Sequence, residues 1–102
     1  DESAWEETVS FGTFPKNTYQ NGAYWNTPTG WICYAISQIS PDIGKSLAIK
    51  YVRQLQSDDF RMGDEFGAPY ECIHPDENHR QNPVYLTSVT CPLAAFQKLG
   101  WV

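Results

Sequence analysis

The stretch GDEFGAPYECIHPDENHRQN, from Gly63 to Asn82, separates two helical patterns and holds most of the residues suited to chemistry. It contains five carboxylates, both histidines and one of the three cysteines. Glycines and prolines interrupt it and oppose a regular helix: Gly63, Gly67, Pro69 and Pro75. Apolar side chains provide anchors, so we expect an ordered loop, and long loops in small domains are usually functional when they are ordered.

Three segments around this loop have helical periodicity. The first begins near Thr27-Pro28, where Thr suits a cap and Pro the first helical position, and ends before Pro41. Its apolar stripe has helical spacing: Ile32, Ala35, Ile36 and Ile39.

The second predicted helix begins at Ser40-Pro41-Asp42 and runs to about Gln56. Its predicted buried line consists of Ile43, Leu47, Tyr51 and Leu55. The third runs roughly over residues 84–99, with an inner face of Leu86, Val89, Leu93, Phe96 and Leu99. Pro92 should kink or restart it.

The sequence therefore predicts an all-α fold of three main helices in hairpin-like succession, with the long loop between the second and third. We expect one domain, or a fragment of one, over residues 1–102, with an irregular arm at 1–28 and a helical part at 29–100. Three helices with many aromatic residues are more easily explained as part of a larger domain than as a domain of their own. An apolar face left without neighbours would also promote self-association.

Composition narrows the classes of partner. The formal net charge is −5 and the seven Lys and Arg residues are scattered, which argues against a nucleic acid as partner. Nothing in the chain approaches the roughly 18 consecutive apolar residues of a membrane span. No motif points to a cofactor. The odd number of cysteines leaves at least one thiol unpaired within the chain, and the compartment stays open.

Two motifs together resemble glycoside hydrolases of the six-hairpin, (α/α)6-toroid type, which include trehalases, α-glucosidases and debranching relatives. Tyr19-Gln20-Asn21-Gly22-Ala23-Tyr24-Trp25, followed by Pro28-Thr29-Gly30-Trp31, is similar to a loop and helix start in that superfamily. Tyr70-Glu71-Cys72-Ile73-His74-Pro75 is similar to its Glu-x-Tyr-x-Pro segment. Ile73 departs from that pattern, and Asp76-Glu77-Asn78 stands where a Gly usually follows the Pro.

The resemblance covers about residues 19–100 and implies the C-terminal part of a glycoside hydrolase, with the general acid in an earlier part of the toroid. It assigns Glu71 as the general base that activates a water. It also places Trp25, Trp31 and Tyr70 along a sugar site, because helix starts of the inner ring face the active centre. A periplasmic or secreted location is favoured by this resemblance alone.

Each candidate residue also has a plainer interpretation. Glycoside hydrolysis needs two carboxyl groups, and Glu71 has candidate partners in Asp64, Glu65 and Asp76. Without the resemblance, Glu71 would be assigned to solvated surface. His74 suits a hydrogen bond within the loop or to a sugar hydroxyl. Trp31 is equally suited to stacking on a sugar and to packing between helices.

Metal and nucleophile chemistry are weaker interpretations. The spacing of Cys72, His74, Asp76, Glu77 and His79 fits no closed zinc pattern, so we predict no metal site. Ser88 and Cys91 fall on a helix pattern with no base beside them, which favours packing. We therefore expect one wall of a carbohydrate site in an isolated chain that is inactive. The alternative is a small non-catalytic helical module that binds a glycan or a protein.

Overall fold

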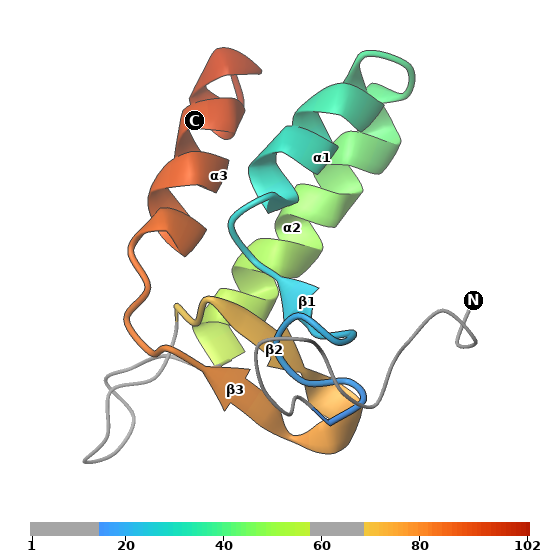
Figure 1. Ribbon diagram of the computed structural model, residues 1–102. Coiled ribbons are helices and arrows are strands. Elements are labelled where there is room, and N and C mark those ends of the chain that lie inside the picture. The colour runs from blue at the N-terminus through green and yellow to red at the C-terminus, as the bar shows by residue number, and fades with distance from the viewer. Residues whose placement is uncertain (1–14, 58–68) are drawn as a thin grey trace.

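The computed structural model describes residues 15–57 and 69–102. Figure 1 shows the helices α1 (Thr29–Ser37), α2 (Pro41–Ser57) and α3 (Thr87–Lys98) packed beside a small sheet at one end of the molecule. The helix α1 runs away from the sheet, α2 returns toward it, and α3 runs away again. The prediction of an all-α fold is therefore wrong, because the described residues form three helices and a three-stranded antiparallel sheet.

The sheet is antiparallel and consists of β1 (Tyr24–Trp25), β2 (Cys72–His74) and β3 (His79–Gln81), in that order. Part of the predicted loop thus forms a hairpin, in which Ile73 lies opposite Arg80. A 3-10 turn, η2 (Pro75–Glu77), reverses the chain, and Asn78 completes it in the left-handed region at φ 49°. Asn tolerates that conformation better than most residues. The strands have only two or three residues each, which is too short for an alternating pattern to indicate them.

The helix bounds agree closely with the predicted ones, but the buried faces agree only in part: Tyr51 on α2 and Phe96 on α3 are buried as predicted, while Ile43 is 57% exposed. On α1, the buried residues are Gly30, Cys33 and Ser37. The predicted stripe is largely outside: Ile39 is 90% exposed and Ile32 is 52% exposed. The same exchange occurs on α3, where Ser88, Pro92, Ala95 and Phe96 are buried while Leu86 is 70% exposed.

Close helix packing explains this exchange. A Cβ on Gly30 would lie 2.6 Å from the Cα of Pro92, so α1 and α3 approach each other through a glycine. A Cβ on Gly44 of α2 would overlap the Oγ of Ser37, so α1 and α2 meet in the same way. Because large side chains would hold such helices apart, the small residues face inward. The core contains Cys33, Ala48, Ala95 and Phe96.

Pro92 lies within α3, and the helix continues through it without a restart. A proline has no N–H, so the carbonyl of Ser88, one turn earlier, loses its helical partner. The hydroxyl of Tyr51 on α2 donates to that carbonyl at 2.5 Å. The bond fixes α2 against the start of α3 and satisfies a buried acceptor. Among the described helices, none is both long and apolar enough to cross a membrane.

Candidate functional site

Glu71 lies directly before β2, at the junction of the sheet with the starts of α1 and α3. Its N–H donates to the carbonyls of Gln81 at 3.0 Å and Asn82 at 3.2 Å, and its carbonyl accepts from the N–H of Asn26 at 3.0 Å. The residue is only 7% exposed. Its backbone is thus held from both sides, which fixes the direction of the side chain.

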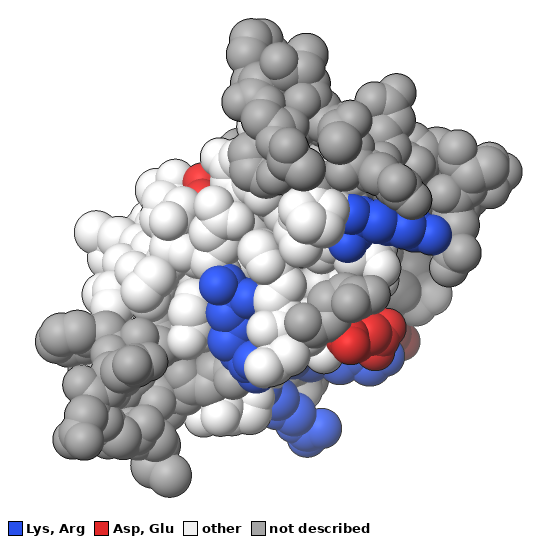
Figure 2. Space-filling view, turned by 60° about the horizontal axis from the view of Figure 1, so that its bottom comes forward, with Lys and Arg blue, Asp and Glu red and all other residues white. Residues whose placement is uncertain are grey.

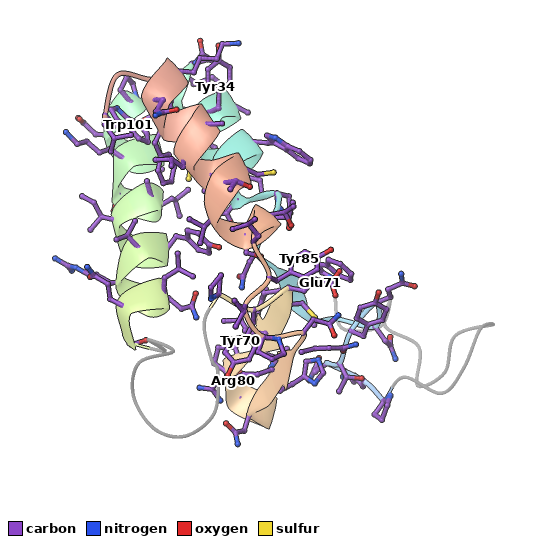
Figure 3. The ribbon with its side chains drawn as sticks, turned by 90° about the vertical axis from the view of Figure 1, so that its left-hand side faces the viewer. Tyr34, Tyr70, Glu71, Arg80, Tyr85 and Trp101 are labelled. Atoms are coloured by element: carbon purple, nitrogen blue, oxygen red, sulfur yellow. The ribbon has the colours of Figure 1, made fainter. Side chains whose placement is uncertain are left out.

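The carboxylate of Glu71 has two side-chain partners. Its Oε2 accepts a hydrogen bond of 2.5 Å from the Nδ2 of Asn82. It also accepts a hydrogen bond from the hydroxyl of Tyr85, and this bond, followed by the negative charge of Glu71, raises the pKa of the Tyr85 phenol. Figure 3 shows Glu71 and Tyr85 side by side below the start of α3. Tyr85 therefore stays protonated and acts as a donor.

Aromatic and hydroxyl groups surround this pair. The hydroxyl of Thr87 hydrogen-bonds the Tyr85 phenol, and Tyr19 lies close enough to influence its ionisation. The Tyr19 ring contacts the Trp25 ring, with centroids 5.1 Å apart. We call Glu71, Asn82, Tyr85, Tyr19 and Trp25 the Glu71 cluster. A fixed carboxylate, an amide and hydroxyls next to aromatic faces can bind a polar ring that carries hydroxyl groups.

The start of α1 and the start of α3 frame the cluster. The Thr27 and Thr87 hydroxyls lie 3.1 Å apart and join the two helix starts. Helix N-termini carry partial positive charge from unpaired N–H groups, which favours a nearby carboxylate. The Thr27–Thr87 contact thus holds the two helix starts together beside the Glu71 cluster.

Tyr70 supports the cluster through its backbone. Its carbonyl accepts from the Nδ2 of Asn26 at 2.8 Å and from the Oγ of Ser88 at 2.7 Å. Both donors belong to buried residues. Ser88 is therefore a structural donor, in agreement with the packing role predicted for it.

The predicted residues His74 and Trp31 contact other parts of the molecule. The ring of His74 is 6% exposed and stacks on Tyr24, with centroids 5.2 Å apart, and its Nδ1 has no hydrogen-bond partner among the described residues. Trp31 is 62% exposed and lines a groove between α1 and α3 together with Tyr34 and Lys98. Of the five predicted site residues, Glu71 and Trp25 belong to the cluster.

Of the three carboxylates considered as partners of Glu71, Asp64 and Glu65 lie outside the described residues, and Asp76 is exposed in η2. Within the described ranges, no three His, Cys, Asp or Glu residues gather to suit a metal ion. Asn82, Tyr85 and Tyr19 were not among the predicted site residues. Asn82 ends the quoted stretch and Tyr19 opens the first motif, but Tyr85 had no signal beyond its place before a helix.

Cysteine chemistry is suppressed at the buried positions. Cys33 and Cys72 are fully buried, and burial raises the pKa of both thiols, that of Cys72 to about 11 with a further contribution from Glu71. Cys91 is half-buried on α3, and all three cysteines are free. On the face shown in Figure 2, the Lys and Arg side chains stand apart from one another rather than in one patch.

Comparisons with protein-family models, with curated proteins and with solved structures find no match to this chain.

Proposed function

We propose that this chain is the C-terminal part of a six-hairpin glycoside hydrolase, in which it forms one wall of a carbohydrate site and supplies Glu71 as general base. The observation that carries the proposal is the Glu71 carboxylate, which is buried and held by Asn82 and Tyr85. A carboxylate offers about four acceptor positions, so these two bonds leave acceptor positions with which it can accept a hydrogen bond from a water molecule. A positioned carboxylate next to a water is what general-base catalysis requires.

The arrangement of the helices supports the same proposal. The helices α1 and α3 run in one direction and α2 runs in the other, and both α1 and α3 begin at the end that holds the Glu71 cluster (Figure 1). The resemblance implies inner helices whose starts face the active centre. In this assignment α1 and α3 are inner helices and α2 is an outer one.

Exposed apolar side chains on the helices provide a third line of support. Ile32 on α1 and Ile43 on α2 are more than half exposed, as are Ile39 directly after α1 and Leu86 directly before α3. A part of a toroid would bury such residues against neighbouring hairpins. The general acid would come from one of those hairpins, so this chain alone should not cleave a glycosidic bond, because one carboxylate cannot serve as both acid and base.

Sugar binding by the chain itself provides a test. We would record the indole N–H signals of the tryptophans by NMR during titration with a panel of monosaccharides and disaccharides. The proposal predicts that a sugar shifts the signal of Trp25, while those of Trp31 and Trp101 stay in place as internal controls, because both lie on the helical grooves. A sugar that shifts Trp31 and leaves Trp25 unchanged would contradict the assignment of the site.

The alternative, a non-catalytic binding module, gives Glu71 a different role from the one it has in a hydrolase. A binding module uses Glu71 as an acceptor for a sugar hydroxyl, and Glu71→Gln keeps one acceptor oxygen. In Glu71→Gln, the affinity for the sugar would then change little. Turnover that depends on Glu71 would also be absent from every longer polypeptide that contains this chain.

A further inference from the structure

A second surface lies on the helices, on α2 and the C-terminal end of the chain. It is a groove of about 290 Å³ between α2 and the residues Phe96, Trp101 and Val102. Figure 3 shows Trp101 after the end of α3, beside α2. The Phe96 and Trp101 rings are 5.8 Å apart and form one wall. None of the residues that line this groove belongs to the Glu71 cluster.

The other wall is a single stripe of α2. The α2 residues that line the groove are Lys45, Ala48, Ile49, Val52, Arg53 and Gln56. Their spacing follows one helix face over three turns, a length of about 16 Å at a rise of 1.5 Å per residue. Ile49 is 45% exposed and Val52 is 40% exposed, so their apolar surfaces are available.

Most of the charges along this side of α2 are positive. Lys45 lies one turn before Ile49 and Arg53 one turn after it, and both side chains are exposed. The next residues along the same side of α2 include Lys50. Asp42 is the only carboxylate in the whole of α2. The groove therefore combines an apolar floor with a basic rim.

We propose that this groove binds an amphipathic α-helix whose apolar stripe is flanked by Asp or Glu residues. A straight apolar groove with the spacing of three helical turns fits the helix-in-groove mode of recognition, in which side chains at i, i+3, i+4 and i+7 insert. The basic rim selects acidic flanks, because opposite charges across an interface favour the correct partner and like charges reject others. This inference does not depend on the proposed hydrolase.

A second copy of the chain is a poorer occupant for this groove. A two-fold symmetric contact places the same surface on both partners. The basic rims of the two copies would then face each other, and the like charges of Lys45 and Arg53 would oppose the contact.

The test uses two designed peptides of sixteen residues with the same leucine stripe (about four helical turns), one with Glu and one with Lys at the flanking positions. We would titrate each into the chain by calorimetry. The proposal predicts that the acidic peptide binds at least about tenfold more tightly than the basic one, a preference of roughly 1.4 kcal/mol. The double variant Lys45→Glu, Arg53→Glu should reverse that preference. The matched control Lys16→Glu, Arg80→Glu changes net charge equally but lies away from α2, and it should preserve the preference.

Further variants separate this occupant from the others. Val52→Asp places a charge on the half-exposed floor and should abolish binding of the acidic peptide while circular dichroism and thermal unfolding show a folded chain. The proposal is overturned if the acidic peptide does not bind, or if Lys45→Glu, Arg53→Glu binds it equally well. It is also overturned if Val52→Asp instead disrupts a dimer of the chain, or if the groove variants change binding to anionic phospholipid vesicles and leave peptide binding unaltered.

Discussion

At the scale of single residues, the Glu71–Tyr85 pair shows how the backbone prepares a site. Backbone bonds from Asn26, Gln81 and Asn82 fix Glu71, and its carboxylate then meets a phenol that follows the hairpin. The pairing makes each group depend on the other. The Tyr85 hydroxyl donates a hydrogen bond to the Glu71 carboxylate. The charge of the carboxylate opposes the formation of a second negative charge on the phenol.

Glu71→Gln should therefore lower the pKa of the Tyr85 phenol. The hydrogen bond to the Glu71 carboxylate and then its negative charge raise the pKa of Tyr85; the substitution removes the charge, leaves a weaker amide acceptor and keeps the size of the side chain. The measurement is a pH titration of chain labelled with ¹³C-tyrosine, in which Tyr85→Phe identifies the signal. Asp76→Asn is the matched control, because Asp76 is exposed in η2 and should leave Tyr85 unchanged. An equal Tyr85 titration in wild type and Glu71→Gln would refute the pairing.

The buried thiol of Cys72 should make the fold sensitive to alkaline pH. Its pKa is raised to about 11 from an ordinary value of 9.0, so the folded state holds this proton more tightly than the unfolded state. The resulting stability is fully present below about pH 9 and is lost as the pH rises to about 11. A two-unit shift corresponds to a loss on the order of 2 kcal/mol.

Urea unfolding at neutral pH and at several alkaline values measures this loss. Cys72→Ala should be less stable at neutral pH, because a buried atom is removed, but its stability should fall less steeply between pH 9 and 11. Cys91→Ala is the control with unchanged pH dependence, since Cys91 is only half-buried. Parallel curves for wild type and Cys72→Ala would exclude the thiol as the cause.

The sequence located the centre of the cluster but not its partners. Glu71 and Trp25 stood in motifs with a stated chemistry, while Asn82 and Tyr85 reach Glu71 only through the strand pairing and the turn before α3. His74 and Trp31 stood in the same motifs and face other neighbours. A motif fixes the order of residues along the chain, whereas side-chain partners depend on register.

At the scale of elements, the bond from Tyr51 to the Ser88 carbonyl replaces what Pro92 removes from α3. Tyr51→Phe should lower the free energy of unfolding by about 1–3 kcal/mol, because it leaves a buried carbonyl without a donor. Burial, countered in part by the bond to Ser88, raises the pKa of this phenol, which agrees with a hydroxyl that stays protonated.

A double-mutant cycle makes this prediction specific. Pro92→Ala restores an N–H that can donate to the Ser88 carbonyl. Tyr51→Phe should therefore lower the free energy of unfolding by less in the Pro92→Ala protein than in wild type. The measurement is chemical denaturation of the four proteins. If Tyr51→Phe lowers the free energy of unfolding equally in wild type and in Pro92→Ala, the Tyr51 hydroxyl does not replace the missing hydrogen bond.

Helix positions were predictable from local chemistry, and helix faces only in part. The prolines at Pro28 and Pro41 act within a few residues, so α1 and α2 begin close to where the sequence indicates. Pro28, and not Thr27, is the N-cap of α1, and no side chain caps that helix. Val84 has a positive φ of 56°, which is incompatible with a helix start there, and α3 begins later. Tyr51 and Phe96 are buried as predicted. The rest of the inner faces differ because the pattern weighs hydrophobicity, while Gly30 and Gly44 lie where the helices approach most closely.

At the scale of the whole molecule, the sheet and the helix starts form one end and the exposed apolar helix faces form the sides (Figure 1). The sheet escaped prediction because its strands are short and two of them lie within a segment rich in Gly, Pro and acidic residues. The exposed faces include Ile32 on α1 and Ile43 on α2, which the periodicity had assigned to the interior. In the proposed hydrolase, both features have a function: the end holds the base and the sides meet further hairpins.

Turnover by a longer polypeptide that contains this chain tests the central claim most directly. We would compare wild type, Glu71→Gln and Asp76→Asn against a panel of aryl glycosides, with folding checked by circular dichroism. A general base contributes about 10²–10⁴-fold to the rate, so Glu71→Gln should lose at least about a hundredfold in kcat while Asp76→Asn retains wild-type turnover. If wild type cleaves a glycoside and Glu71→Gln cleaves it equally well, Glu71 is not the base and the Glu71 cluster has a structural role.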